Sequence, residues 1–568
     1  MKNKITLIII ILLGFTFRIW NLDNLPAGFT ADEASHGYDA YSLIQTGKDQ
    51  WGQPWPIAFR SFGDFKLPVY TYLTIPFILI GGLNEFTVRL PGALFGTLAI
   101  LTTFLFAKEL FKLSKLPVTN YRLPMLSALL LMISPWHVQL SRQAVEANLT
   151  SFFIPLALWA WLKGLLSTRN LNYWWLLSAF ILGINLYTYH AARAFTLLIV
   201  PLIILISCIQ MNKGFLQLIK QHFLPILIFI IFLVPMGISL VSGGSSRGLD
   251  VAIFNPTDNW QALSNLRHET VLSGIPDFLA RLTTNKLTYT VKEFIQNYII
   301  YLSPYFLFVQ GSGEATYGML PGRGVLNWFE LPFILIAILF TIKKPNFPVK
   351  FLLVLLLLAP IPAALSKGAG LAANRATPML PFIHILSAYG LTIILYQPHK
   401  LNKLLKITSY LFLCLSAFLF FGFFLKDYII HAPKIQAQAM SSGWREAVPY
   451  LNQVSDQYDY IIISRKFNEP QIFLMFYTPM DPVKIQQITP NWLAYEKQNL
   501  NFIDQLGEYH LGKITFLEIQ TEHFQQPNTL IVARPQDLLT PKPTINQILK
   551  PAYPQPTPAI TFIDTNTL

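Results

Sequence analysis

The fold class can be inferred from the apolar segment Phe223-Leu-Pro-Ile-Leu-Ile-Phe-Ile-Ile-Phe-Leu-Val-Pro-Met-Gly-Ile-Ser-Leu-Val241, which contains no charged side chain. A helix of this length spans the hydrocarbon core of a bilayer, which is about 30 Å thick. Ten other apolar segments accompany it, near 5–20, 88–107, 123–134 (extended by its flanks), 149–166, 173–189, 193–210, 326–342, 351–365, 378–396 and 407–425. The pattern predicts an α-helical integral membrane protein with about eleven transmembrane helices.

The composition supports this class. Of 568 residues, 53% are hydrophobic and only 12% are charged, whereas soluble domains carry roughly 25% charged residues. These values exclude a disordered chain, a coiled coil and an ordinary soluble enzyme. Cys208 and Cys414 both lie inside apolar segments, so the sequence predicts neither a disulfide framework nor a cysteine-based zinc site.

The net charge of +13 reflects membrane topology. Lysine and arginine cluster in alternate loops, which hold 16 basic residues and one acidic residue, Glu109. By the positive-inside rule these loops are cytoplasmic. The N-terminus is then cytoplasmic, and the outer side receives the loops 21–87, 135–148, 242–325 and 366–377 together with the C-terminal tail. The rest of the chain is close to neutral, so the charge does not indicate nucleic-acid binding.

Two domains are expected. Residues 1–426 form the transmembrane domain, in which the apolar piece 294–309 is interpreted as an interfacial or re-entrant helix because it contains Pro304. Residues 427–568 form a small extracytoplasmic α/β domain. An amphipathic helix begins near Gly443, and 458–464 and 529–533 have the apolar pattern of buried strands. The last ~30 residues are rich in Pro and Thr and are expected to be mobile.

The first outer loop carries the most promising chemistry. Thr30 and Glu33 fit a capping box at the start of a helix, so Glu33 has either a capping role or a catalytic one. Asp32 is not used by the cap and projects from the first turn, and Asp39 follows seven residues later on the same helical face. Lys66 stands between aromatic residues at the edge of the membrane, where an ammonium suits a lipid phosphate. The simpler alternatives are a solvated Asp32 and a snorkelling Lys66.

The second outer loop adds Arg142 and Glu146. Their spacing of four residues is compatible with a pair within one helix, or with Glu146 as a second carboxylate near the first loop. Other basic residues stand at the outer ends of predicted spans and either line a cavity for an anionic head group or serve as ordinary boundary residues. They are Arg193, Arg323, Lys367 and Arg375.

Taken in order, these residues resemble the GT-C type membrane glycosyltransferases. The similarity is to the family 39 branch, which includes protein O-mannosyltransferases and the aminoarabinose transferases of lipid A. It is carried by Asp32-Glu33, by Lys66-Leu-Pro68-Val-Tyr70, by Val88-Arg89-Leu-Pro91, by Ser141-Arg142 with Glu146, and by Asn374-Arg375.

The resemblance implies a GT-C-like fold and inverting transfer of a sugar from a polyprenyl-phosphate donor to an acceptor hydroxyl on the extracytoplasmic face. The catalytic residues would be Asp32, Glu33 and Glu146. The donor phosphate would be bound by Lys66, Arg375, Arg142 and Arg323, and the substrate site would be lined by His36, Asp39, Tyr70 and Arg193. The acceptor would be a protein, a glycolipid or a cell-envelope polymer.

Several alternatives stay open at this point. A divalent metal shared by Asp32 and Glu146 is one, although no cofactor is required by the sequence. A transporter of lipid or polysaccharide is another, but transporters place ionisable groups near mid-membrane and often show internal repeats. The compact loops and the lack of an obvious retention signal favour a bacterial cytoplasmic membrane.

Overall fold

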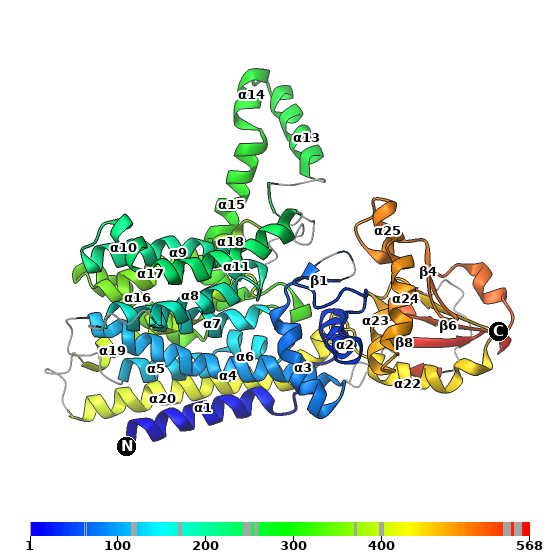
Figure 1. Cartoon of the computed structure of the whole chain (residues 1–568), viewed down its shortest axis with the longest axis horizontal. Coiled ribbons are helices and arrows are strands. Elements are labelled where there is room, and N and C mark those ends of the chain that lie inside the picture. Colours follow the sequence, from blue (N-terminus) through cyan, green and yellow to red (C-terminus); the bar gives the residue numbers. More distant parts are fainter. Residues whose placement is uncertain are drawn as a thin grey trace.

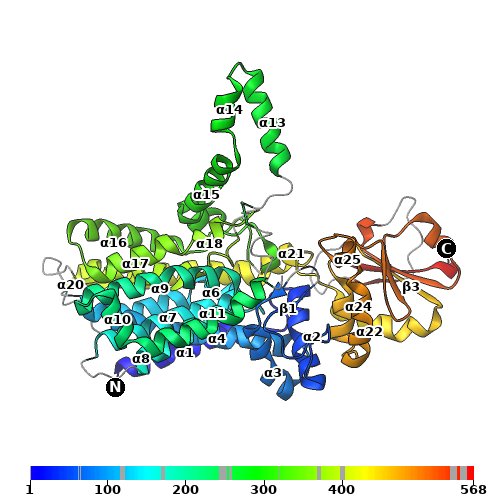
Figure 2. The ribbon, with the colours of Figure 1, turned by 45° about the horizontal axis from the view of Figure 1, so that its top comes forward.

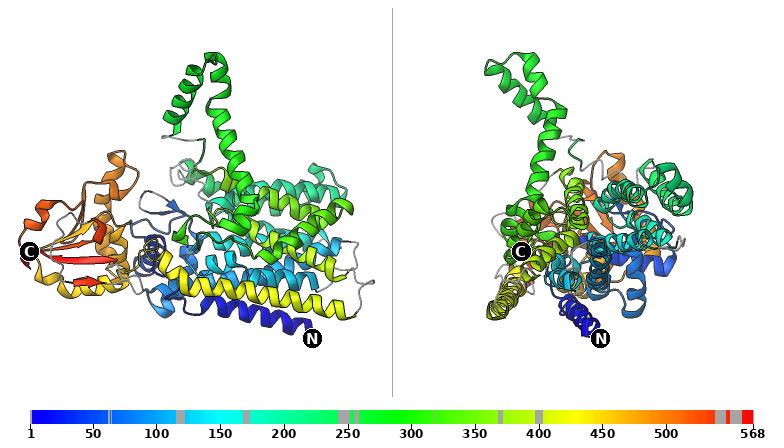
Figure 3. Two further views of the ribbon diagram at one scale, coloured as in Figure 1. Left: turned by 180° about the vertical axis from the view of Figure 1, so that it is seen from behind. Right: turned by 90° about the vertical axis from the view of Figure 1, so that its left-hand side faces the viewer.

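The computed structural model describes residues 2–61, 63, 65–114, 122–167, 173–241, 252–254, 259–317, 319–367, 372–396, 403–537, 547–549 and 559–567. A bundle of long helices forms one end of the molecule and a mixed α/β domain forms the other, with a helical arm projecting crosswise from the bundle (Figure 1). The N-terminus lies at the end of the bundle that is far from the α/β domain (Figure 3).

Every predicted span coincides with a helix or a helix pair. The helices of the bundle are α1 (Lys2–Ile19), α4 (Glu85–Leu110), α5 (Arg122–Met132), α6 (Pro135–Ser141), α7 (Ala147–Leu165), α8 (Tyr173–Asn185), α9 (His190–Met211), α10 (Phe215–Gln221), α11 (Phe223–Val241), α16 (Leu331–Lys343), α17 (Phe347–Leu358), α18 (Ile361–Ala364), α19 (Leu380–Tyr396) and α20 (Lys403–Lys426). Apolar segments without water must satisfy their backbone groups internally, which a helix does.

By length and composition, the described helices include fewer candidate membrane spans than the eleven that the sequence predicts. Five helices of the described chain are long and apolar enough to cross a membrane, and seven are if two bent pairs each count as one span. The pair α5–α6 bends by 60° at Ser134-Pro135, and the pair α10–α11 bends by 85°. The architecture is that of a multi-pass membrane protein, while the number eleven stays a prediction.

Helix α4 lies at the centre of the bundle and packs against α1, α5 and α7. Two glycines on it allow the end of α6 and the segment that follows to approach closely. A Cβ atom on Gly92 would clash with the carbonyl oxygen of Gln143, and one on Gly96 would clash with the side chain of Ser141. Small residues at such contacts let two backbones come together.

The predicted first outer loop, residues 21–87, holds more secondary structure than its sequence indicates. It contains α2 (Ala31–Thr46), a short hairpin of the two-residue strands β1 (Phe59–Arg60) and β2 (Phe65–Lys66), and the apolar helix α3 (Val69–Gly81). Helix α3 was not predicted. Its 13 residues are too few for a span, because a transmembrane helix needs about 20.

The arm consists of α13 (Asn259–Leu272), α14 (Asp277–Thr283) and α15 (Lys286–Leu302), and we use this name for residues 259–302. A π-helical segment, Tyr305–Gln310, follows it. The predicted interfacial piece 294–309 thus comprises the end of α15 and most of this segment.

The C-terminal domain follows α20 through a π-helical turn (Asp427–His431) and α21 (Ala432–Gln436). Its sheet has the order β4-β5-β3-β6-β8-β7, and β3 pairs in parallel with both β5 and β6. The strands are β3 (Tyr460–Ser464), β4 (Glu508–Leu511), β5 (Ile514–Leu517), β6 (Thr529–Ala533), β7 (Gln547–Leu549) and β8 (Ile560–Asp564). The helices are α22 (Trp444–Val454), α23 (Pro470–Tyr477), α24 (Pro482–Trp492) and α25 (Ala494–Lys497).

The predicted amphipathic helix and both predicted strands are confirmed as α22, β3 and β6. The expectation of a mobile tail is wrong for 560–564, which pair with β6 as β8 and are almost fully buried. Parts of the tail, 538–546 and 550–558, lie outside the described residues. Helices α22, α23 and α24 face the first outer loop, so the domain sits against α2 (Figure 2).

Candidate active site

The site starts from the N-terminus of α2. Thr30 caps the helix: its hydroxyl accepts from the backbone N–H of Glu33 at 3.2 Å, and its own N–H donates to Glu33 Oε2 at 3.1 Å. The predicted capping box is therefore present. It fixes the first turn and leaves the side chain of Asp32, which is 50% exposed, at the surface of the site.

Lys66 meets Asp32 at this turn. Its Nζ lies 2.9 Å from Asp32 Oδ1 and donates to the Asp32 carbonyl oxygen at 3.2 Å. The lysine side chain is only 6% exposed. Burial alone would lower its pKa, but the carboxylates of Asp32, Glu146 and Glu469 outweigh burial and raise the pKa above its ordinary value. Lys66 is therefore a fixed cation at neutral pH.

Glu146 brings the second outer loop into the same place. It immediately precedes α7, and its Oε1 lies 3.5 Å from His36 Nε2. The other ring nitrogen of His36 is bonded to Thr71 Oγ1 at 2.8 Å. Asp32, Lys66, His36 and Glu146 thus gather from α2, β2 and the start of α7, as the sequence analysis expected of one site.

Glu33 has a different environment. Its Oε1 accepts from Arg89 Nε at 2.8 Å and from the N–H of Ala144 at 3.0 Å, while Oε2 accepts from Arg89 Nη2 at 3.1 Å and from Thr30. Both charged side chains are buried. Of the two roles left open for Glu33, this geometry favours the structural one, because it ties α2 to α4 and to the second outer loop.

Arg142 does not adopt the predicted arrangement. Helix α6 ends at Ser141 and α7 begins at Ala147, so Arg142 and Glu146 are not on one helix. The guanidinium of Arg142 instead donates to the carbonyl oxygens of Phe17 (2.6 Å), Trp20 (2.7 Å) and Leu25 (3.0 Å), and the residue is 1% exposed. It fastens the end of α1, and its Nη groups are not presented to a phosphate.

Asp39 and Tyr70 are also more deeply buried than expected for substrate-lining residues. Asp39 accepts from the backbone N–H and side chain of Gln50, each at 3.1 Å. Burial, and after it the charge of Asp49, raises the pKa of Asp39 to about 8. The Tyr70 hydroxyl donates to the Val88 carbonyl and accepts from the Gly92 N–H, both at 3.1 Å. Both side chains are therefore buried next to the site and do not line it.

The remaining arginines lie at three different places. Arg323 pairs with Asp427 at the end of α20, and Arg193 donates through Nε to the carbonyl of Leu186 at 2.9 Å. Arg375 is partly exposed and donates to the carbonyl of Lys367 at 3.1 Å. These contacts do not involve Asp32, Lys66, His36 or Glu146, so a role of the three arginines in binding the donor phosphate stays a prediction.

No three His, Cys, Asp or Glu side chains of the described chain come together in a way that would hold a metal ion. Of the two ligands considered from the sequence, Asp32 forms an ion pair with Lys66 at 2.9 Å, and Glu146 raises the pKa of the same lysine through its charge. Within the described residues, a metal shared by Asp32 and Glu146 would therefore lack a third protein ligand.

Two residues beside the site were not predicted as site residues from the sequence. Arg89 neutralises Glu33. The motif Val88-Arg89-Leu-Pro91 is part of the family resemblance, but nothing in the sequence assigns Arg89 a role in the site. Glu469 comes from the C-terminal domain, at the junction of β3 and α23, and acts electrostatically on Lys66. No local pattern connects it with a lysine 403 positions earlier.

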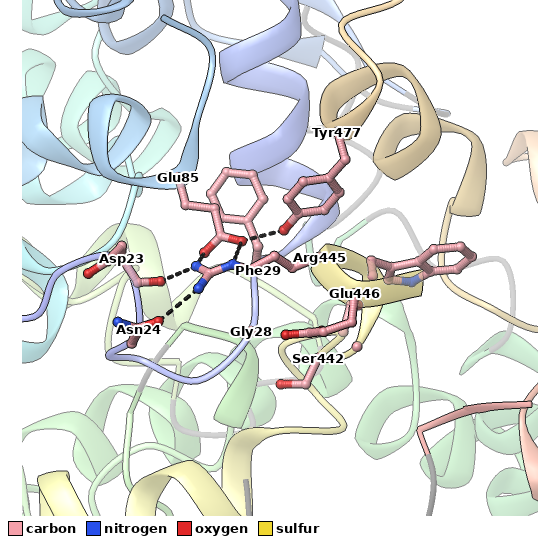
Figure 4. A pocket seen from close by; sticks show the side chains of 12 residues that line it. Asp23, Asn24, Gly28, Phe29, Glu85, Ser442, Arg445, Glu446 and Tyr477 are labelled. Atoms are coloured by element: carbon pink, nitrogen blue, oxygen red, sulfur yellow. Dashed lines mark hydrogen bonds and ion pairs between the residues drawn. The ribbon is translucent and has the colours of Figure 1, made fainter. Parts of the chain in front are cut away.

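The C-terminal domain is held beside the site by a second polar cluster, shown in Figure 4. Arg445 forms an ion pair with Glu85 at the start of α4 and donates to Asn24 Oδ1 at 2.7 Å, and the Tyr477 hydroxyl also donates to Glu85. The cavity there has a volume of about 30 Å³, room for one or two water molecules at most. This cluster joins the two domains, and its cavity is too small for a substrate.

Comparisons with known proteins identify the fold. Residues 66–238 match the family model described as dolichyl-phosphate-mannose-protein mannosyltransferase. The crystal structure of ArnT from Cupriavidus metallidurans bound to undecaprenyl phosphate is similar over 98% of this chain and 97% of that one, with a TM-score of 0.52 and 12% identity. No curated protein matches the sequence.

The oligosaccharyltransferase AglB from Archaeoglobus fulgidus, in complex with an inhibitory peptide and a dolichol-phosphate, has 14% identity and a TM-score of 0.46. The match covers 84% of this chain, which spans 63% of the length of AglB. The resemblance of this chain to the GT-C type membrane glycosyltransferases is thus confirmed, by the family model over residues 66–238 and by the fold it shares with ArnT.

Proposed function

We propose that the protein transfers a sugar from a polyprenyl-phosphate donor to an acceptor hydroxyl on the extracytoplasmic face, with inversion at the anomeric carbon. The observation that carries this proposal is the cluster of Asp32, Lys66 and Glu146, in which one buried ammonium stands among carboxylates. A lipid-linked donor cannot leave the bilayer, so its enzyme must present such groups at the membrane edge.

Lys66 and Arg375 have the chemistry to bind the departing phosphate. As the glycosidic C–O bond breaks, negative charge develops on the phosphate oxygen, and fixed cations stabilise that charge without reorganising. When the donor enters, its phosphate competes with Asp32 for Lys66 and releases the carboxylate toward the acceptor. The exposures suit this exchange. The half-exposed carboxylate of Asp32 can turn away from the lysine, while the buried ammonium of Lys66 stays in place.

Asp32 then acts as the general base. The acceptor hydroxyl oxygen forms the new bond to the anomeric carbon from the side opposite the phosphate, and its proton passes to the carboxylate. Attack from the opposite side inverts the anomeric centre. Glu146, whose carboxylate lies 3.5 Å from His36 and whose charge raises the pKa of Lys66, helps to keep both groups in place during this step.

The family model and the ArnT fold support the donor class, since ArnT was crystallised with undecaprenyl phosphate. The transporter alternative would require ionisable groups deep in the bundle. The buried pair Glu330–His384, joined at 2.8 Å, lies near two helix ends, because Glu330 is the N-cap of α16 and His384 stands in the second turn of α19. This position favours an interfacial enzyme over a mid-membrane pathway.

The experiment that tests the proposal compares Asp32→Asn with the wild type, using radiolabelled polyprenyl-phosphate sugar and a membrane extract as acceptor. We expect the transfer rate to fall by about 10²–10⁴-fold, with donor binding retained. Asp23→Asn is the matched control, because Asp23 is exposed in the same loop and contacts Arg445 only through its backbone carbonyl. Transfer by Asp32→Asn at the wild-type rate would show that Asp32 is not the base, and a wild type that binds no such donor would refute the function.

A further inference from the structure

The arm leaves the bundle crosswise to the long helices, close to their outer ends (Figures 1 and 3). The base of the arm and the chain that precedes it are both held at the C-terminal end of α18. The N–H of Ile253, which precedes the arm, donates to the Leu365 carbonyl at 2.9 Å, and Asn297 Nδ2 of α15 donates to the Ala364 carbonyl at 3.2 Å. Leu365 stands ten positions before Arg375 in the chain.

An apolar stripe runs along α15. Leu287, Val291, Ile295 and Ile299 follow one another at intervals of four residues, so they share one face of the helix. They are 72%, 46%, 48% and 59% exposed. A folded chain in water rarely leaves a continuous stripe of this kind uncovered, because each Å² of apolar surface costs about 25 cal/mol.

The stripe continues around the tip of the arm. Leu272 is 72% exposed, Phe278 66% and Leu282 69%. The charged groups of the arm are mixed in sign and lie beside this surface. Asp277 pairs with Arg281 at 2.7 Å, and Lys286 stacks 4.4 Å from the Trp260 ring. A partner recognised by charge would need an excess of one sign, so the arm fits an apolar partner bordered by polar groups.

The root of the stripe joins the exposed apolar surface of a candidate membrane span, Phe347–Ala364. The Tyr298 hydroxyl donates to the carbonyl of Leu357 at 2.7 Å, and Leu357 itself is 51% exposed on the long apolar helix α17. The exposed face of α15 therefore begins where the exposed face of a spanning helix ends. A helix that turns crosswise at that level lies parallel to the membrane surface, as interfacial amphipathic helices do.

We propose that residues 259–302 lie in the outer interface of the bilayer, with the Leu287–Ile299 stripe and the tip residues inserted between lipid head groups and acyl chains. The partner is the lipid surface itself. The inference does not depend on the transfer reaction, because it concerns where the arm lies.

The test measures the surroundings of single fluorophores on the full-length protein. Cys208 and Cys414 are first replaced by Ser. An environment-sensitive label is then attached to Leu287→Cys or Ile295→Cys on the stripe, and to Gln296→Cys as the control on the polar side of the same helix. Each protein is placed as one copy per nanodisc of phosphatidylcholine and phosphatidylglycerol, with or without a quencher on the lipid chain.

We expect the stripe labels to be quenched by the lipid-borne quencher at least about twofold more than the Gln296 label. Their emission should shift to the blue, and neither effect should change in about 0.5 M salt, because insertion of an apolar face is not electrostatic. Stripe labels quenched by aqueous iodide as readily as the Gln296 label would overturn the proposal by placing the arm in water. Protection that appears only with two copies per disc would overturn it in favour of a self-interface.

Discussion

Lys66 is the residue on which the proposed chemistry most depends. A buried ammonium is stable only when opposite charges compensate it. Here Asp32 pairs with Lys66 at 2.9 Å, and the charges of Glu146 and Glu469 also raise the pKa of the lysine. In the absence of donor the site is thus held together by its own ion pair, and a phosphate can take the place of one carboxylate without leaving the lysine unpaired.

Replacement of Lys66 tests this exchange. Lys66→Met should weaken the binding of undecaprenyl phosphate at least about tenfold, equivalent to ~1.4 kcal/mol, because no fixed cation then meets the phosphate. Lys66→Arg should retain part of the affinity. Binding is measured by titration of the purified protein in detergent. Lys48→Met, an exposed lysine in the same loop, should bind normally, and normal binding by Lys66→Met would contradict the role of this residue.

Asp39 makes a prediction about pH. Its pKa is raised in the folded state to about 8 by burial and by Asp49, whereas an unfolded Asp titrates near about 3.9. Between these values the folded state binds the proton and the unfolded state does not. The stability that the folded state gains by keeping Asp39 protonated is therefore fully present at low pH. It is lost as the pH rises from about 4 to about 8.

Asp39→Asn should flatten this decline, since the amide cannot become charged. The melting temperature in detergent, followed across that pH range, is the measurement. The variants are compared by the slope of the melting temperature against pH and not by the melting temperature itself, because the amide also changes the contact with Gln50. Asp456→Asn, whose side chain is 96% exposed, should keep the wild-type slope. An equally steep slope for Asp39→Asn would show that Asp39 is ionised throughout.

At the scale of the elements, the buried pair of Glu33 and Arg89 links helices that the membrane alone would not align. Glu33 sits in the first turn of α2 and Arg89 in the second turn of α4. Arg89 also donates to the Leu22 carbonyl at 3.1 Å, so one guanidinium joins the end of α1, α2 and α4. The position of Asp32 follows from this link, because it precedes Glu33.

Breaking the pair from one side should be costly. Arg89→Met leaves Glu33 buried and uncompensated, and we expect a loss of about 3–5 kcal/mol in the free energy of unfolding, measured by denaturant titration in mixed micelles. The double variant Glu33→Gln/Arg89→Met should recover part of the loss. Lys513→Met removes an exposed partner of Asp456 and should cost only ~0–1 kcal/mol. A similarly small loss for Arg89→Met would mean that the pair is hydrated.

The elements show how far sequence reasoning reaches. Apolar segments predicted the helices well, because hydrocarbon imposes one solution on the backbone. The apolar pattern placed the end of one span at residue 134, but it predicted neither α3 nor the short helix α6 that begins at Pro135. In the site, Asp32, Lys66 and Glu146 come together as expected from their common side of the membrane. Arg142, Asp39 and Tyr70 do not line it, because no local pattern reveals which polar side chains tertiary packing will cover.

At the scale of the whole molecule, the C-terminal domain completes the site. It contributes the carboxylate of Glu469 to the surroundings of Lys66. It also contacts the hairpin that carries this lysine, because Arg60 of β1 pairs with Glu496 of α25. The domain is positioned by the cluster around Arg445 and Glu85, and by Gln486, whose amide donates to Thr46 Oγ1 at 2.9 Å. Its attachment should therefore affect transfer without any direct contact with the donor.

Arg445→Met tests this coupling. Without the guanidinium, Glu85 keeps only Tyr477 among these partners, and the seam between the domains should open more often. We expect hydrogen exchange in residues 23–28 and 441–446 to accelerate about tenfold, the effect of ~1.4 kcal/mol on local opening, while α7 stays protected. Transfer should slow through a higher KM for the acceptor, with donor binding unchanged. Lys484→Met, an exposed residue of the same domain on α24, should change neither. If exchange accelerates but transfer does not slow, the domain is attached to the site without taking part in it.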